Sequence, residues 1–85
     1  MMARITNLEW NGQPVYRSWL TPKKCELAFD SREIKMLPSG GWKFVRWVRL
    51  FTLKVDRRHS IKRIMEQARQ AELNLVKLPG IKVVR

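Results

Sequence analysis

The run from Trp42 to Val55 constrains the fold most, because its apolar residues change faces partway along. Aromatic and β-branched residues dominate the run, which favours a strand over a helix. In a strand, Trp42 and Phe44 would share one face, whereas Phe51 and Val55 would lie on the other, since side chains alternate. One regular strand therefore cannot bury both apolar sets.

The same run is also too long for one regular strand in a small domain. Fully extended, it would span about 45 Å at roughly 3.3 Å per residue. We therefore expect a bulge or sharp bend between residues 45 and 50 that resets the register. An amphipathic helix over 42–51 is the alternative, because Lys43, Arg46 and Arg49 recur at a spacing of three.

The parity of the run separates expected core from expected surface. We expect Trp42 and Phe44 to pack in the core, and Lys43, Trp47 and Arg49 to share the opposite, exposed face. Cations interleaved with flat aromatic rings suit nucleic acid, because Lys and Arg meet phosphates while unstacked bases lie on the rings. For Trp47, packing beneath a loop is the alternative.

Two turn signals predict hairpins on either side of the middle of the chain. Asn11-Gly12, between two apolar arms, predicts a hairpin over residues 4–20. The run Pro38-Ser39-Gly40-Gly41 predicts a tight turn that leads into the strand beginning at Trp42.

The segment from 21 to 37 fits two descriptions. Thr21-Pro22 is a good N-cap and first-position pair, which predicts a short helical turn followed by a strand at 33–37. Alternation of apolar residues would instead suit two strands around an Asp30-Ser31 turn. We favour the first description.

A C-terminal helix is predicted at about 61–75, with Ser60 as its N-cap. Its apolar stripe consists of Ile61, Ile64, Met65, Ala68, Ala71 and Leu75. Pro79-Gly80 then makes a turn before a short strand at 81–85, so the chain ends in a β-α-β unit whose connection is long enough for a right-handed parallel crossover. The predicted fold class is α+β: a small antiparallel-rich sheet of about four to five strands packed against this helix.

Length and composition predict a single basic domain over residues 1–85 that depends on packing for its stability. One Cys and one His are too few for an internal disulfide or a zinc site, and we expect no metal and no cofactor. The N-terminus lacks the apolar stretch of a signal peptide, and Lys or Arg interrupts every apolar run. We therefore expect an intracellular, cytoplasmic protein that does not enter membranes.

Charge is the strongest functional indication in the sequence. The formal net charge is +11 on 85 residues, and the segment 42–63 carries +7 of it, from eight basic residues and one acid. Such a charge repels itself unless a polyanion offsets it, and nucleic acid is the commonest such partner. Anionic membranes and acidic protein surfaces are the competing partners.

The candidate nucleic-acid-binding residues form two groups, one in the long strand and one around the helix start. A helix N-terminus offers free backbone N–H groups, which together with Lys and Arg suit phosphate. The candidates are Lys43, Arg46, Trp47, Arg49, Arg57, Arg58, Lys62 and Arg63. If the two groups lie on opposite sides of the fold, they cannot form a single surface.

The residues exclude most other functional classes. His59 has no nucleophile or carboxylate pair tied to it by spacing, and no Gly-rich phosphate loop exists, so we expect no enzyme. The signatures of helix-turn-helix, RNP, KH and zinc-finger domains are also missing. The sequence predicts a small protein that binds DNA or RNA. The alternative is a phage- or mobile-element-type interaction module that binds and modulates a host enzyme, and a dimer could form through an edge strand.

Overall fold

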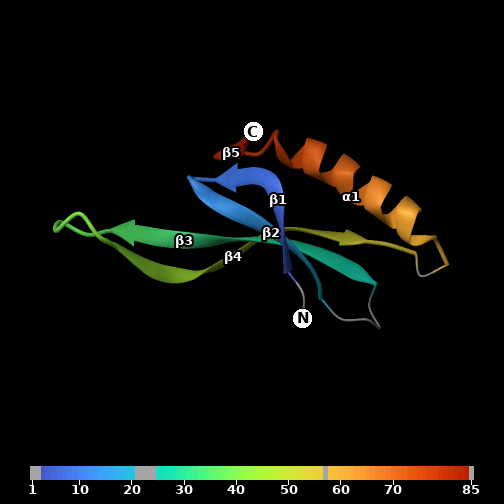
Figure 1. Ribbon diagram of the computed structural model, residues 1–85, viewed down its shortest axis with the longest axis horizontal. Helices are drawn as coiled ribbons and strands as arrows, with labels where there is room; N and C mark the ends of the chain where they lie inside the picture. The colour runs from blue at the N-terminus through green and yellow to red at the C-terminus, as the bar shows by residue number, and fades with distance from the viewer. Residues whose placement is uncertain (1–2, 21–24, 57, 85) are drawn as a thin grey trace.

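The computed structural model describes residues 3–20, 25–56 and 58–84, and shows a five-stranded sheet with one helix against it (Figure 1). The elements are β1 Ala3–Trp10, β2 Gln13–Trp19, β3 Glu26–Met36, β4 Trp42–Lys54, α1 Ile61–Leu75 and β5 Ile81–Val83. The strand order is β4-β3-β2-β1-β5, and every neighbouring pair is antiparallel. The predicted α+β class and the C-terminal helix are confirmed.

The β4-α1-β5 unit spans the whole sheet. Because each neighbour in the sheet is antiparallel, β4 and β5 run in the same direction, but they lie at the two opposite edges. The helix between them crosses one face of the sheet (Figure 1). The β-α-β order was predicted from the sequence, whereas the pairing of β5 with β1 was not.

The predicted hairpin over residues 4–20 is confirmed as β1 and β2. Asn11 and Gly12 both have positive φ, 49° and 83°, as a two-residue turn of the primed type requires. The Asn11 N–H donates to the carbonyl of Gly80 at 2.9 Å. Gly80 has φ of 81°, and a Cβ there would lie 2.5 Å from Asn11 Oδ1, so only glycine lets the loop before β5 approach the turn this closely.

The prediction for residues 21–37 is wrong over most of its length, because β3 is one continuous strand from Glu26 to Met36. The predicted helical turn begins at 21–24, outside the described residues. Asp30 and Ser31, which suggested a turn, instead find partners within the sheet. Asp30 accepts from Arg49 Nε at 3.0 Å, and Ser31 Oγ donates to the carbonyl of Pro14 at 2.7 Å. Polar residues such as these are tolerated in the middle of a strand when their side chains have hydrogen-bond partners.

The expected break in β4 is confirmed, but it consists of two bulges. Phe51 pairs with Phe29 and Arg49 with Asp30, which leaves Leu50 as an extra residue. Further along, Arg46 and Phe44 pair with consecutive residues of β3, which leaves Val45 extra. Each bulge shifts the alternation by one residue, so the two shifts cancel.

The prediction that Trp42 and Phe44 enter the core is therefore wrong. Because the two shifts cancel, these side chains lie on the sheet face opposite to that of Phe51, whose partner Phe29 is buried. Trp42 is 55% exposed and Phe44 is 43% exposed. They share their face with Trp47 and Arg49, which were predicted to be exposed, whereas Lys43, predicted on the same face as Trp47, lies on the other.

The core lies between α1 and the sheet. Ser60 caps the helix as predicted, and its Oγ accepts from the Arg63 N–H at 3.3 Å. The buried cluster consists of Leu8, Val15, Leu27, Phe29, Val55, Ile64, Ala68, Ala71, Leu75 and Ile81. The predicted helical stripe is confirmed except at Ile61, which is 71% exposed.

The β3–β4 hairpin extends well past the other elements (Figure 1). The last residue of β3 with a partner in β2 is Asp30. Residues 32–47 therefore form a two-stranded projection, which we call the ribbon, closed by a turn in which the Leu37 N–H donates to the carbonyl of Gly41 at 2.8 Å. The molecule consequently measures 51 × 24 × 18 Å.

Candidate nucleic-acid interface

The two faces of the sheet differ in what covers them. Leu27 and Phe29 point toward α1, and Arg17 on the same face binds Glu72 of the helix with a 3.1 Å ion pair. No described helix or strand covers the opposite face, which we call the open face (Figure 1). Its side chains come from the alternate positions of β2, β3 and β4.

Four aromatic residues gather on the open face: Tyr16, Trp42, Phe44 and Trp47. The ring centroids of Tyr16 and Trp47 are 5.7 Å apart, and those of Phe44 and Trp47 are 5.9 Å apart. Both pairs meet edge to face, at 75° and 62°, so neither is stacked in parallel. Trp47 remains 57% exposed. Aromatic rings that pack on one another and yet remain exposed to water are typical of binding surfaces.

Two arginines lie among these rings. The guanidinium of Arg32 is 5.6 Å from the centre of the Trp42 ring and over its face, a cation–π contact. Arg49 binds Asp30 through Nε at 3.0 Å, and this hydrogen bond raises the pKa of Arg49. Among the described residues Arg32 has no ion pair, whereas Arg49 is neutralised by its carboxylate.

The other face of the ribbon carries further cations. Lys43 and Lys35 are directly opposite each other in the ladder. Like charges in this position repel, so the pair lowers the stability of the ribbon unless an anion binds nearby. Arg46 is partly compensated, because its Nε lies 2.7 Å from Glu33 Oε1.

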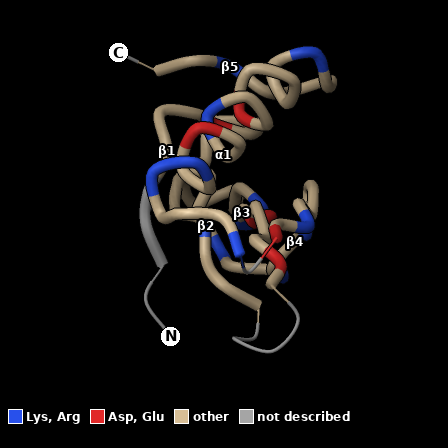
Figure 2. Tube along the Cα trace, turned by 90° about the vertical axis from the view of Figure 1, so that its right-hand side faces the viewer, with Lys and Arg blue, Asp and Glu red and all other residues tan. Residues whose placement is uncertain are grey.

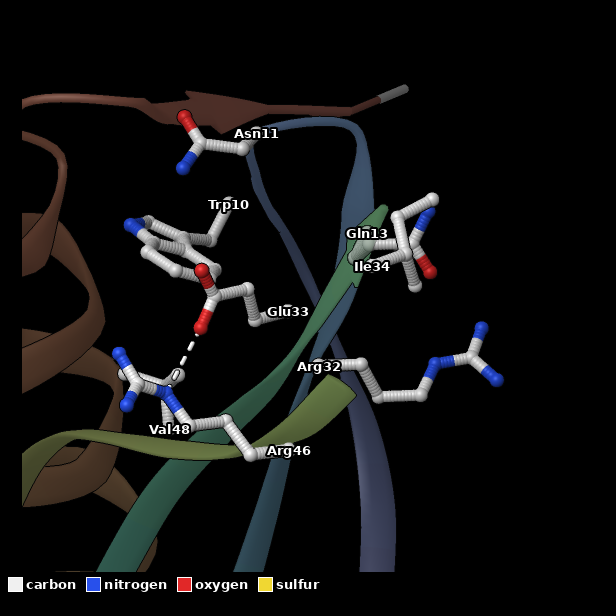
Figure 3. A pocket seen from close by; sticks show the side chains of 8 residues that line it. All are labelled: Trp10, Asn11, Gln13, Arg32, Glu33, Ile34, Arg46 and Val48. Atoms are coloured by element: carbon white, nitrogen blue, oxygen red, sulfur yellow. Dashed lines mark ion pairs between the residues drawn. The ribbon is translucent and has the colours of Figure 1, made fainter. Parts of the chain in front are cut away.

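A polar hollow of about 390 Å³ marks the junction between the ribbon and the rest of the sheet (Figure 3). The Arg46–Glu33 ion pair and Trp10 form one wall, and Arg32 points away from them across the strand. Val48 lies beneath the ion pair. Arg32 and Arg46 both line the hollow, although they belong to opposite faces of the ribbon.

The second candidate group lies at the start of α1, and part of it is already paired. Arg58 donates from Nη2 to Asp56 Oδ2 at 2.9 Å and from its backbone N–H to Oδ1 at 2.9 Å. These hydrogen bonds lower the pKa of Asp56. Lys62 and Arg63 are exposed and have no ion pair among the described residues. Arg57, another candidate, lies outside the described residues.

The structure keeps the two candidate groups apart. Lys43, Arg46, Trp47 and Arg49 lie on or beside the ribbon, and the helix start lies at the other end of the long axis (Figure 1). Lys43 and Lys54 pair with Lys35 and Glu26 of β3, nine residues apart, so this part of β4 spans roughly 30 Å. Figure 2 shows Lys and Arg spread over both the helix and the sheet. The described members of the two groups therefore lie toward opposite ends of the molecule.

Three residues beside the candidate strand were missed from the sequence: Tyr16, Arg32 and Lys35. They come next to Trp47, Trp42 and Lys43 only through the pairing of β2, β3 and β4. The turn signal at 38–41 predicted a hairpin between the strand at 33–37 and the strand from Trp42, but not its register, so Arg32 and Lys35 were not placed beside their partners. No local signal pointed to Tyr16.

Metal sites and membrane-spanning helices are further possibilities to consider within residues 3–20, 25–56 and 58–84. No group of three or more His, Cys, Asp or Glu side chains gathers there in a way that could hold a metal ion. No helix in this part of the chain has the length and apolar character needed to cross a membrane. Comparison with protein-family models, with curated proteins and with solved structures finds no match to this chain.

Proposed function

We propose that this protein binds nucleic acid, DNA or RNA, through phosphate contacts made mainly by the ribbon and to a lesser extent by the start of α1. The observation that carries the proposal is the ribbon itself, in which exposed aromatic rings alternate with cations on a projection that has no core of its own. The ribbon holds four basic residues and one acid, so its net charge is +3.

Electrostatics supports the ribbon as the primary contact. Its lysines face each other at close range, and Arg32 has no carboxylate partner among the described residues. Bound phosphates would relieve the repulsion between the lysines and release condensed counterions from the nucleic acid. At the helix start, by contrast, Arg58 already forms an ion pair with Asp56.

The test is a titration of labelled single- and double-stranded DNA and RNA across a salt series, read by fluorescence anisotropy. Affinity should fall steeply as salt rises, because each phosphate contact releases counterions. Binding that stays constant between low and moderate salt would contradict the proposal and favour a protein partner instead.

A pair of charge-matched variants locates the contact. Lys35→Gln with Lys43→Gln removes two cations from the ribbon, and Lys62→Gln with Arg63→Gln removes two from the helix start. The first variant should weaken binding to all sequences about equally and reduce the single-strand salt slope by about 1.4. The second should have the smaller effect. Equal losses would assign the attraction to net charge alone and not to the ribbon.

A further inference from the structure

We propose that the open face of the ribbon is a stacking site for unpaired bases, so that the protein prefers single-stranded nucleic acid to duplex. This inference rests on the proposed function and adds to it the class of nucleic acid bound. The site consists of Tyr16, Trp42, Phe44 and Trp47, with Arg32 and Arg49 beside them. We call it the stacking site.

The aromatic rings of the stacking site are not needed to build the core. Trp42, Phe44 and Trp47 are 55%, 43% and 57% exposed, and the buried cluster lies on the other face of the sheet under α1. Large aromatic side chains left in water on one contiguous surface indicate a partner. Their edge-to-face contacts hold the rings in place without stacking them on one another.

The spacing of the rings follows the ladder. Trp47, Phe44 and Trp42 lie opposite Arg32, Ile34 and Met36, three successive open-face positions of β3. These positions span about 13 Å along the strand. That length corresponds to about four nucleotide steps of one strand at roughly 3.4 Å each. A short single-stranded segment can therefore contact all three rings.

The cations around the rings select a polyanion over an uncharged apolar partner. Arg32 lies against the Trp42 ring, and Lys35 and Lys43 lie on the reverse side of the same narrow ribbon. A nucleotide strand lying on the rings has phosphates at its margins, within reach of long basic side chains from either face. An apolar peptide on the open face would cover Arg32 without offering its guanidinium a partner, at a cost in free energy.

The preference for single strands over duplex follows from the shape of the site. In a duplex the faces of the bases are covered by their neighbours, so rings on a sheet surface meet only base edges and phosphates. In a single strand the faces are available for stacking, whatever the base. The stacking site should therefore discriminate between paired and unpaired nucleic acid, with weak preference among sequences.

The decisive experiment compares Trp47→Ala and Phe44→Ala with the wild-type protein and with Leu73→Ala. Leu73 is 64% exposed on α1 and serves as the control for loss of an exposed apolar side chain. The probes are labelled oligouridine and oligothymidine, which cannot pair with themselves, and a duplex of matched length. Circular dichroism and the urea midpoint verify that each variant is folded.

Each aromatic variant should bind the single strands about 5- to 150-fold more weakly, the range expected for loss of one stacked base. Duplex affinity should change less than twofold, and the salt slope should stay the same because no charge is removed. Trp47→Phe should recover most of the loss, since a ring is restored. Leu73→Ala should bind as the wild type does.

The outcomes separate this inference from the proposed function. If the wild-type protein binds neither single strands nor duplex, both fail. If it binds nucleic acid with a steep salt dependence, but the aromatic variants bind as the wild type does or duplex is preferred, only the stacking site is wrong.

Discussion

The part of the sheet under α1 and the projecting ribbon are built from similar residues used for opposite purposes. Under the helix, Phe29 is fully buried and its neighbours form the core. Further along the same two strands, Phe44 and Trp47 are about half exposed. Aromatic content alone therefore does not distinguish core from surface. What distinguishes them is whether a second layer covers that face of the sheet.

The largest expected difference concerns the two phenylalanines. Phe29→Ala should destabilise the protein by about 3–5 kcal/mol, because it removes a buried ring and leaves a cavity. Phe44→Ala should cost less than about 1 kcal/mol, because the ring is already partly in water. Urea unfolding followed by circular dichroism measures both values. Similar losses for the two variants would show that the ribbon supports the fold as much as the core does.

Two ion pairs provide the second comparison. The Arg17–Glu72 pair joins the sheet to α1, and its side chains are only 13% and 18% exposed. Glu72→Ala should therefore cost about 2 kcal/mol. Glu33→Ala breaks the exposed Arg46 pair of the ribbon and should cost under about 1 kcal/mol. The same unfolding measurement applies, and a larger loss for Glu33→Ala would contradict the contrast.

The junction between the two regions gives a smaller effect. Ser31 is fully buried, and its Oγ donates to the carbonyl of Pro14 at 2.7 Å, just before the ribbon leaves the sheet. Ser31→Ala should cost about 1 kcal/mol, the typical value of one hydrogen bond. The matched control is Ser39→Ala in the exposed turn, where the change should be within about 0.5 kcal/mol. Equal unfolding midpoints would mean that this hydrogen bond does not secure the junction.

The smallest effect is a pH dependence at the connection from β4 to α1. Hydrogen bonds from Arg58 lower the pKa of Asp56 in the folded protein. Its contribution to stability is therefore fully present above the ordinary aspartate value of about 3.9 and is lost as pH falls through the lower folded value. Asp56→Asn keeps an acceptor for the Arg58 N–H but removes the charge. Thermal melts between neutral and strongly acidic pH should show this acid-induced loss in the wild type and a smaller one in Asp56→Asn.

The sequence predicted correctly those elements that a short stretch of chain determines by itself. The Asn11-Gly12 turn, the Ser60 cap and the α1 stripe each require only a short stretch of chain, and each is confirmed. The break in β4 was also predicted, because the parity of its apolar residues changes. The face on which Trp42 lies was predicted wrongly, because one bulge alone would turn Trp42 to the core face, and the second bulge returns it to the open face.

The candidate site was harder to predict, because it depends on pairing between strands. Arg49 was expected on the exposed face with Trp47, and the ladder places both there. Arg32 joins that face only because β3 continues through Asp30 and Ser31, where the sequence suggested a turn or a boundary. Long-range partners satisfy these polar side chains, and no local pattern contains that information.

The two bulges also affect how the free edge of the sheet behaves. β4 is an outer strand, and its thirteen residues pair with eleven of β3. A long edge rich in aromatic and β-branched residues is ordinarily prone to aggregation, because its open N–H and C=O groups can pair with another chain. Here the extra residues at Val45 and Leu50 interrupt that row, and Lys43, which has no ion pair among the described residues, would repel the same edge of a second copy. Both features oppose strand addition to the segment with the strongest strand-forming composition.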